Sequence, residues 1–299
     1  SRTVSSPLNV VAVRSIAGSA SNGGGGGGAA AASMSMRELW KTMTSICKAE
    51  GVRGLFKGNM ANSVSSAPGK AIDFFAYAAY KGLLTGNVDR EPTNVERLMA
   101  GSLAGMTSDS ILYPLEVAST RVTLEKGKYG NFVQAMVQIA KKEGIRGLYS
   151  GWGAAMIGVI PYAGISFGCY DILSTQYKKT MKVDSAGPVP TLFMGFASGW
   201  LASTMSFPLY SATVKLQSGL VPALANGRKA NLASVLMNTV KSGPEGWRAL
   251  FNGWFPATVK IIPQAGTSFV VYEIVKRKLD KANFLDDDDD DNDDDDLER

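Results

Sequence analysis

The sequence predicts an all-α membrane protein with six transmembrane helices in three homologous two-helix repeats, three short surface helices and a pseudo-threefold barrel. Three observations predict this fold. One short signature occurs three times in the same register, long stretches of small and apolar residues lie between its copies, and a short amphipathic segment precedes each copy. Self-similarity in a fixed register is the sequence mark of a repeat architecture.

The signature is a Glu-Gly pair followed, after four residues, by an aromatic residue, a variable residue and a glycine. Its terminal glycines are Gly58, Gly151 and Gly253. At fixed distances after these glycines stand the prolines Pro68, Pro161 and Pro263 and the tyrosines Tyr77, Tyr170 and Tyr272. Upstream of each signature is a Pro-Leu pair, with Pro7, Pro114 and Pro208. This register divides the chain into repeats at 1–90, 91–184 and 185–285, followed by an acidic tail at 286–299.

Five stretches are long enough to span a membrane, since about 20 apolar residues cross the hydrocarbon core. They cover residues 59–84, 97–120, 152–177, 191–217 and 254–279. The ionisable residues inside them, namely Asp73, Asp109, Asp171 and Lys260, are costly at membrane depth unless they face a bundle interior or water. Asp73 and Asp109 could line a pore, or could cap or pair with neighbouring chains, and the sequence does not decide between these alternatives. The pairs Gly101/Gly105 and Gly195/Gly199 have the GxxxG spacing of close helix contacts in lipid. A soluble helical repeat protein is the alternative, but prolines in mid-helix favour kinked membrane helices.

Three amphipathic segments, at 36–49, 130–142 and 230–242, are expected to lie on the membrane surface. The loops beside them are rich in Lys and Arg, which places them on the inner, negative side. The Gly/Ala run at 23–32 is expected to be an exposed insertion. The tail has ten Asp, one Glu and one Arg, and such a composition favours disorder.

Several classes of function are disfavoured by what the sequence lacks. It has no histidine, and its two cysteines, Cys47 and Cys169, show no metal-ligand spacing. It also lacks a GxxxxGK[ST] phosphate loop and a dinucleotide-binding fingerprint. We therefore expect no catalytic residues, no metal and no cofactor, and we discount both a soluble enzyme and nucleic-acid binding.

The triplicate pattern Pro-x-[Asp/Glu]-x-x-[Lys/Arg], then Glu-Gly-x4-[aromatic]-[Lys/Arg]-Gly, resembles the signature of the mitochondrial carrier family. The resemblance covers residues 1–281. Two segments, AGSLAGMTSDSILYPLEV and GVIPYAGISFGCYD, are most similar to the ATP-Mg/phosphate carriers and the Brittle-type adenine nucleotide carriers. By this resemblance Ser1 falls inside the first helix, about half of which is expected to precede it, and no calcium-binding EF-hand lies in the sequence.

The resemblance implies transport by alternating access around a central site with three contact points on the even-numbered helices. These points match Ser65, Gly158 and Lys260. Gly158 with Val159 would accept an adenine face, and Lys260 would bind phosphate as a point charge. Ser65 departs from the cation that nucleotide carriers usually have there. Two alternatives stay open, because Gly158 could instead permit helix packing and Tyr162 could either pack or stack on the substrate.

The resemblance also implies two gates. At the inner gate, near Pro7, Pro114 and Pro208, the acidic positions hold Asn9, Glu116 and Tyr210, and the basic positions hold Ala12, Ser119 and Thr213. Only Glu116 is ionisable, so no ion pair between repeats is expected and inner opening should be easier. Arg14, Arg121 and Lys215 lie two residues further on and point about 200° away on a helix. The outer gate comprises Tyr77, Lys81, Tyr170, Asp171, Tyr272, Glu273 and Lys276, with Lys81–Asp171 as the expected pair.

Gly58, Gly151 and Gly253 occur where family members bind cardiolipin through helix N-terminal amides, although they could equally be turn residues. Two functions follow as hypotheses. The first is exchange of adenine nucleotides, possibly against phosphate, as a multi-pass protein of the mitochondrial inner membrane or, alternatively, of a plastid envelope or thylakoid. The second is a degenerate carrier fold that serves as a structural subunit of a larger membrane complex.

Overall fold

The computed structural model describes residues 2–21, 34–86, 92–125, 129–183, 187–220, 230–242, 246–264, 266–267, 270–271 and 273–275. All regular structure in these residues is helical, as predicted. The Gly/Ala insertion at 23–32 and the acidic tail at 286–299 lie outside the described residues.

Each repeat has the same order of elements. The first contains α1 (Arg2–Ser21), α2 (Met36–Glu50), η1 (Val52–Phe56), α3 (Asn59–Val64) and α4 (Ser66–Thr85). The second contains α5 (Asn94–Leu124), α6 (Phe132–Glu143), α7 (Ile145–Leu148) and α8 (Trp152–Met181). The third contains α9 (Pro188–Ser218), α10 (Leu232–Ser242), η2 (Gly246–Phe251) and α11 (Trp254–Val259); after a turn at Lys260, the described residues up to Val275 are again helical. The helices expected at the first four spans and at the three amphipathic segments are therefore confirmed.

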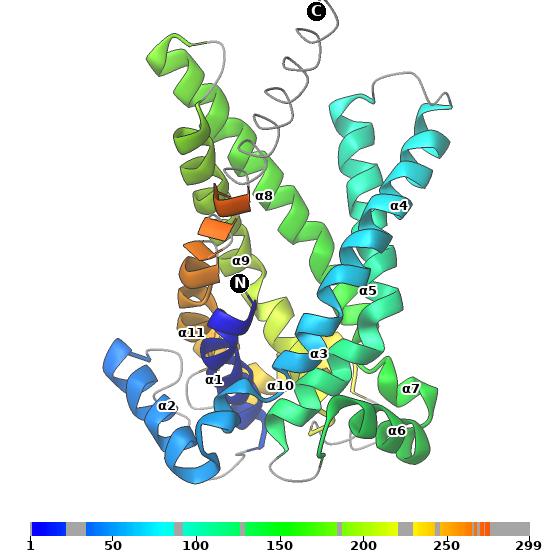
Figure 1. The fold of residues 1–299 in the computed structure, drawn as a ribbon, viewed down its shortest axis with the longest axis vertical. Coiled ribbons are helices and arrows are strands. Elements are labelled where there is room, and N and C mark those ends of the chain that lie inside the picture. The colour runs from blue at the N-terminus through cyan, green and yellow to red at the C-terminus, as the bar shows by residue number, and fades with distance from the viewer. Residues whose placement is uncertain are drawn as a thin grey trace, which may run out of the picture.

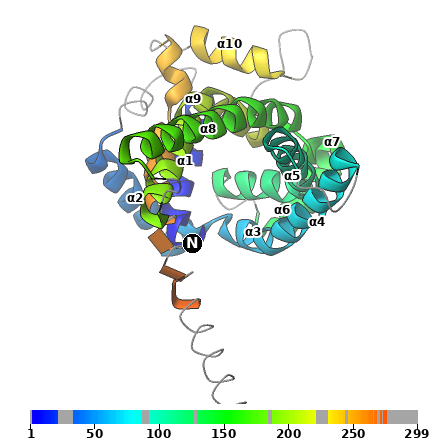
Figure 2. The same ribbon diagram turned by 90° about the horizontal axis from the view of Figure 1, so that it is seen from above.

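The long helices form a ring around a central opening, which is clearest from above (Figure 2). The amphipathic helices α2, α6 and α10 gather at one end of this ring, which we call the inner end (Figure 1). Helix α4 packs on α5 and α8 packs on α9. These two pairs diverge toward the opposite, outer end (Figure 1).

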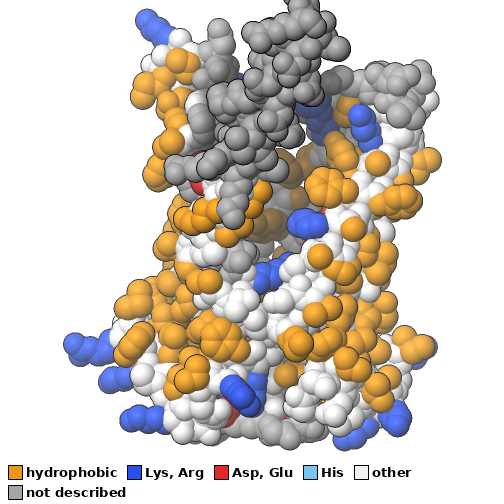
Figure 3. Space-filling view, in the orientation of Figure 1, with side chains coloured by type: hydrophobic (Ala, Val, Ile, Leu, Met, Phe, Trp, Pro, Cys, Tyr) orange, Lys and Arg blue, Asp and Glu red, His pale blue; other side chains and the backbone are white. Residues whose placement is uncertain are grey.

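One stretch of the described helices, Ile145–Met181, is long and apolar enough by itself to cross a membrane, with a mean hydropathy of 1.4. Only 6% of its most apolar window is buried inside the protein, so its apolar side chains face outward. Figure 3 likewise shows hydrophobic side chains over the outer surface and Lys and Arg near the inner end. Helix α5 has a lower hydropathy because polar side chains such as Asp109 and Glu116 line an internal cavity.

Glycine is required at the turn that ends each signature. Gly58, Gly151 and Gly253 have φ values of 77°, 84° and 83°, in the left-handed region that favours glycine. A Cβ on Gly58 would lie 2.5 Å from Thr123 Oγ1, and one on Gly253 would lie 2.8 Å from Ile16 Cγ1. The signature glycines thus allow α3, α8 and α11 to start directly against α5, α9 and α1, each a helix of another repeat.

The GxxxG pairs make no close helix contact within the described part of the chain. A Cβ on Gly101, Gly105, Gly195 or Gly199 would meet no atom of the described residues within 4 Å. Close approach occurs instead at Gly69, where a Cβ would lie 3.0 Å from Leu112 Cδ1. The spacing alone did not reveal which face of α5 and α9 packs on a neighbour.

Candidate functional site

A cavity of about 520 Å³ lies inside the ring of helices. Its lining comes from all three repeats, through α1, α3, α4, α5, α8 and α9 and the turn between α3 and α4. The helix pairs that flank it diverge toward the outer end (Figure 1). A small molecule in this cavity would therefore contact every repeat at once.

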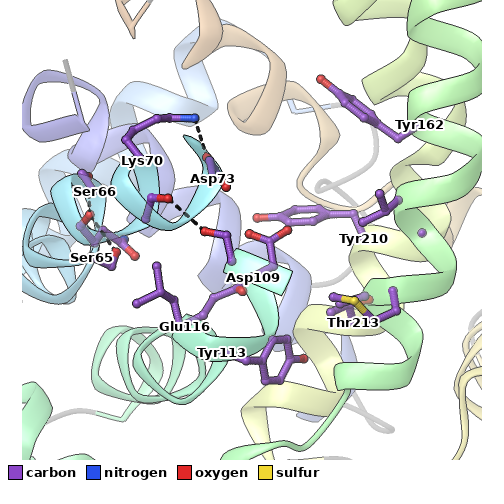
Figure 4. Close-up of a pocket in the computed structure, with 18 of the residues that line it drawn as sticks. Ser65, Ser66, Lys70, Asp73, Asp109, Tyr113, Glu116, Tyr162, Tyr210 and Thr213 are labelled. Carbon is purple, nitrogen blue, oxygen red and sulfur yellow. Dashed lines mark hydrogen bonds and ion pairs between the residues drawn. The ribbon is translucent and has the colours of Figure 1, made fainter. Parts of the chain in front are cut away.

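Two unlike walls face each other across the cavity (Figure 4). On one side α4 carries Lys70, whose Nζ lies 2.9 Å from Asp73 Oδ2. On the other side Tyr162 and Tyr210 project from α8 and α9 (Figure 4). The first wall provides charge and hydroxyl groups, and the second provides aromatic faces.

Four of the five predicted contact residues line the cavity, namely Ser65, Gly158, Val159 and Tyr162. Packing alone does not require glycine at position 158, because an added Cβ would lie 3.8 Å from Leu209 Cβ, an ordinary contact. A small residue there keeps the cavity wall open.

The fifth predicted residue, Lys260, is not among the lining residues. Its Nζ donates a hydrogen bond of 2.9 Å to Asn9 Oδ1 and lies 5.9 Å from the centre of the Tyr210 ring. Tyr210 lines the cavity, and the Lys260 ammonium lies next to its ring without lining the cavity itself.

Arg2 and Lys70 are the lining cations that sequence reasoning missed. Both stand outside the three matched contact positions, although Lys70 lies in the same span as Ser65. The lining carboxylates are Asp73, Asp109 and Glu116. Of the two alternatives that the sequence left open for Asp73 and Asp109, the structure supports the one in which they line the interior.

At the inner end of the cavity, residues of α5 and α9 beside the predicted inner gate are joined by hydrogen bonds. Gln217 of α9 donates 3.2 Å to Glu116 Oε1 and 3.1 Å to the Tyr113 hydroxyl, and its own Oε1 accepts from Thr120 at 3.1 Å. Within the part of the chain that the structure describes, no ion pair joins one repeat to another. The sequence predicts no ion pair between repeats at Asn9, Glu116 and Tyr210. Hydrogen bonds from Gln217 join α9 to α5 in its place.

The prolines of the gate, Pro7, Pro114 and Pro208, lie inside α1, α5 and α9, which we call the odd helices. Between α1 and the second repeat, Arg14 Nε donates 2.9 Å to the Thr123 carbonyl. Ser119 Oγ donates 2.9 Å to the Gly58 carbonyl. The contacts between repeats thus use side chains with backbone acceptors as well as side-chain pairs.

The three basic residues that point away from the ring each fasten a surface helix. Arg14 forms a two-pronged ion pair with Glu50 of α2, with Nη–Oε distances of 2.8 and 2.9 Å. Arg121 forms the equivalent pair with Glu143 of α6. Lys215 donates 3.1 Å to Thr239 Oγ1 of α10. The glutamates of the Glu-Gly pairs are the sequence signal for these contacts, and Glu245 of the third lies outside the described residues.

The Glu50 side chain is nearly buried and also forms an ion pair with Lys57, whose Nζ lies 2.8 Å from Glu50 Oε2. Hydrogen bonding from Arg14, together with that from Lys57 and the two positive charges, lowers the pKa of Glu50 from 4.5 to about 2, against the opposing effect of burial. The glutamate therefore stays ionised at any ordinary pH.

The outer-gate residues are only partly described. Lys81 and Asp171 do not pair in this structure, in which α4 and α8 diverge toward the outer end (Figure 1). Tyr77, Tyr170 and Glu273 are described and half-buried, whereas Tyr272 and Lys276 lie outside the described residues. That these residues close an outer gate stays a prediction, as does lipid binding at Gly58, Gly151 and Gly253.

The protein family of this chain follows from a comparison with models of known families. A sequence model described as "Mitochondrial carrier protein" matches residues 1–88, 90–181 and 184–283. The chain belongs to the mitochondrial carrier protein family. The resemblance found in the sequence is thereby confirmed, together with the all-α carrier fold.

Relatives of this carrier are named as nucleotide transporters. It is 33% identical over 289 residues to a chloroplastic/mitochondrial adenine nucleotide transporter of Arabidopsis thaliana, covering 95% of this chain and 68% of the relative. It is 39% identical over 242 residues to an adenine nucleotide transporter of Zea mays, covering 78% of this chain and 54% of the relative. It is 32% identical over 243 residues to a calcium-dependent mitochondrial ATP-magnesium/phosphate carrier of Arabidopsis thaliana, covering 79% and 48%. The expected likeness to the Brittle-type and ATP-Mg/phosphate carriers is confirmed, and this carrier spans about half the length of the latter two relatives.

Proposed function

We propose that this carrier exchanges adenine nucleotides, against one another or against phosphate, by alternating access across an organelle membrane. The observation that supports this most directly is the cavity with two unlike walls inside the helix ring. The membrane is the mitochondrial inner membrane or, as the named relatives equally allow, a plastid membrane. Cardiolipin at the signature glycines remains part of this proposal.

The nucleotide would lie across the cavity. Arg2 and Lys70 supply the positive charge for phosphate on one side. Gly158, Val159 and Tyr162 offer an open, apolar and aromatic surface for the adenine on the other. Stacking of a base on an aromatic ring contributes about 1–3 kcal/mol in nucleic-acid sites. In this orientation the phosphate contact of the first repeat comes from Lys70 and not from Ser65, which is neutral.

The carboxylates of the lining limit which nucleotide fits. Asp73 is paired with Lys70, but Asp109 and Glu116 add negative charge near the middle of the cavity (Figure 4). A bare polyanion would be repelled there, whereas a nucleotide that carries a divalent cation would be repelled less. We therefore favour a metal–nucleotide complex or a nucleotide of low charge as the cargo.

The test is exchange of labelled ATP and ADP in proteoliposomes, with and without Mg²⁺. Lys70→Gln should lower uptake about tenfold or more, because it removes a charge-assisted contact worth about 1.5–3 kcal/mol. Lys178→Gln is the matched control, since Lys178 is an exposed lysine in the last turn of α8, away from the cavity. Equal uptake by both variants would contradict the proposed orientation.

The structural-subunit hypothesis is kept as a second candidate because no ion pair joins the repeats within the described residues. Absence of uptake by folded protein, together with co-migration with one large membrane complex, would favour it. Nucleotide-dependent thermal stabilisation of the purified protein would favour exchange.

A further inference from the structure

Arg14 and Arg121 join neighbouring repeats as well as holding their own surface helices. Both follow the gate proline of their helix by seven residues. Arg14 Nε donates 2.9 Å to the Thr123 carbonyl of α5, and Arg121 Nε donates 3.0 Å to the Gln217 carbonyl of α9. Thr123 and Gln217 in turn each follow a gate proline by nine residues. The same bond is thus made twice around the ring, from the first repeat to the second and from the second to the third.

The third repeat does not make this bond to the first. The equivalent residue is Lys215, whose Nζ donates to Thr239 Oγ1 at 3.1 Å and, among the described residues, to no other group. Where arginine has its Nε–H donor, the lysine side chain has a methylene group. The acceptor in this register would be the carbonyl of Ile16, which lies five residues before the end of α1 and so has an amide of its own helix as a partner. Within the described residues, no bond of this kind joins α9 to α1.

The side chains that α5 and α1 present to the preceding repeat differ in the same way. On α5, Ser119 Oγ donates 2.9 Å to the Gly58 carbonyl. The residue in the same register of α1 is Ala12, which has no side-chain donor. Ala12 instead belongs to an apolar cluster with Ile16 of its own helix and Phe207 of α9. Apolar packing is not directional, so it fixes the relative position of two helices less strictly than hydrogen bonds do.

One polar contact does cross from the third repeat to the first. Lys260 Nζ donates 2.9 Å to Asn9 Oδ1. Asn9 precedes Ile16 by seven residues, about 10 Å along the helix, and so this bond lies further from the inner end. It does not replace the bonds that Arg14 and Arg121 make nearer the inner end.

We propose that the inner end opens asymmetrically and that the contact between the third and first repeats, which we call the 3/1 seam, separates before the 1/2 and 2/3 seams. The proposal rests on the proposed function only for the statement that the inner end opens. Separating the 1/2 or the 2/3 seam breaks a charge-assisted hydrogen bond from an arginine. Separating the 3/1 seam at the same level breaks none that the described residues make. The cargo would therefore leave toward the inner side between α9 and α1.

Pulsed electron paramagnetic resonance on the purified, nucleotide-free protein in lipid nanodiscs tests this order. Each surface helix is held to its odd helix, so labels on Lys48→Cys in α2, Lys142→Cys in α6 and Asn238→Cys in α10, taken in pairs, give one distance across each seam. All three positions are exposed, and Cys47 and Cys169 are replaced by serine. The pair across the 3/1 seam should have a long-distance population about tenfold larger than the other two pairs, the factor expected for one charge-assisted hydrogen bond. Equal distributions for the three pairs would overturn the proposal.

Arg14→Lys provides a second, independent arm. It keeps a positive charge beside Glu50 and removes the Nε–H donor, so it should enlarge the long-distance population across the 1/2 seam about tenfold and leave the 2/3 seam unchanged. Arg53→Lys is the matched control, because Arg53 is an exposed arginine of the same repeat. A change at every seam alike, or at none, would contradict the asymmetry. If the unsubstituted protein exchanged no nucleotide, the proposed function would fail, and these distances would still decide which seam separates first.

Discussion

Contacts within a repeat and contacts between repeats differ in kind. Within the first two repeats, the ion pairs Arg14–Glu50 and Arg121–Glu143 hold a surface helix to its odd helix. Between repeats, the described polar contacts have a neutral donor or a neutral acceptor, as in Gln217 to Glu116 and Lys260 to Asn9. Under the proposed alternating access, the groups fastened by paired charges would stay together, and the groups joined by weaker bonds would separate.

The largest expected effect falls within a repeat, at Glu50. Glu50→Gln leaves Arg14 and Lys57 without their carboxylate and should lower the free energy of unfolding at pH 7 by about 3 kcal/mol, the cost of removing one partner from a largely buried ion pair. Thermal or denaturant unfolding of the purified protein measures it.

The same residue gives a pH dependence with a definite sign. The folded-state pKa of about 2 lies below the ordinary 4.5, so the unfolded chain takes up the proton first. The stabilisation is therefore complete above about pH 5 and is lost as the pH falls toward 2. The Glu50→Gln variant should lack this part of the acid sensitivity, and an unchanged pH profile would contradict the ion pair.

An intermediate effect is expected between repeats, at Gln217. This side chain is almost completely buried and bonds Glu116, Tyr113 and Thr120. Gln217→Leu removes all three bonds, although Tyr113 keeps its bond to the Ser150 carbonyl, and should cost about 1–3 kcal/mol. Unlike Glu50→Gln, it should also change the rate of exchange, because it weakens the closed inner gate.

Gln134→Leu is the control for this variant, since Gln134 lies on the surface helix α6 and its side chain, among the described residues, bonds only the nearby Gly130 amide. Equal changes of the exchange rate in both variants would show that Gln217 does not belong to the gate.

The sequence predicted the parts of this molecule that repeat. The register located the helices and placed Ser65, Gly158 and Tyr162 in one cavity, because equal spacing on equivalent helices gives equivalent positions. It did not find Lys70 or Arg2, which have no counterpart in the pattern. It also could not say what Arg14 and Arg121 would contact, since helix geometry gives a direction and the partner glutamate lies far along the chain.

Lys260 shows that a correct register does not predict which residue a side chain contacts. Its register was correct and its chemistry was that of a phosphate contact, but its position in this structure depends on Asn9, a residue 251 positions away. Which acceptor a flexible cation reaches is a matter of tertiary distance. Spacing along one helix contains no information on it.

The smallest expected effect tests whether charge or hydrogen bonding holds the surface helices to the odd helices. In the third repeat Lys215 is almost fully buried and reaches the neutral hydroxyl of Thr239 on α10. Thr239→Val keeps the volume and removes this acceptor, so it should cost about 1 kcal/mol, measured by denaturant unfolding, with the exchange rate unchanged. A loss as large as that of Glu50→Gln would mean that hydrogen bonding rather than charge holds the surface helices. In that case the contrast between paired charges within repeats and neutral bonds between them would no longer explain which parts move.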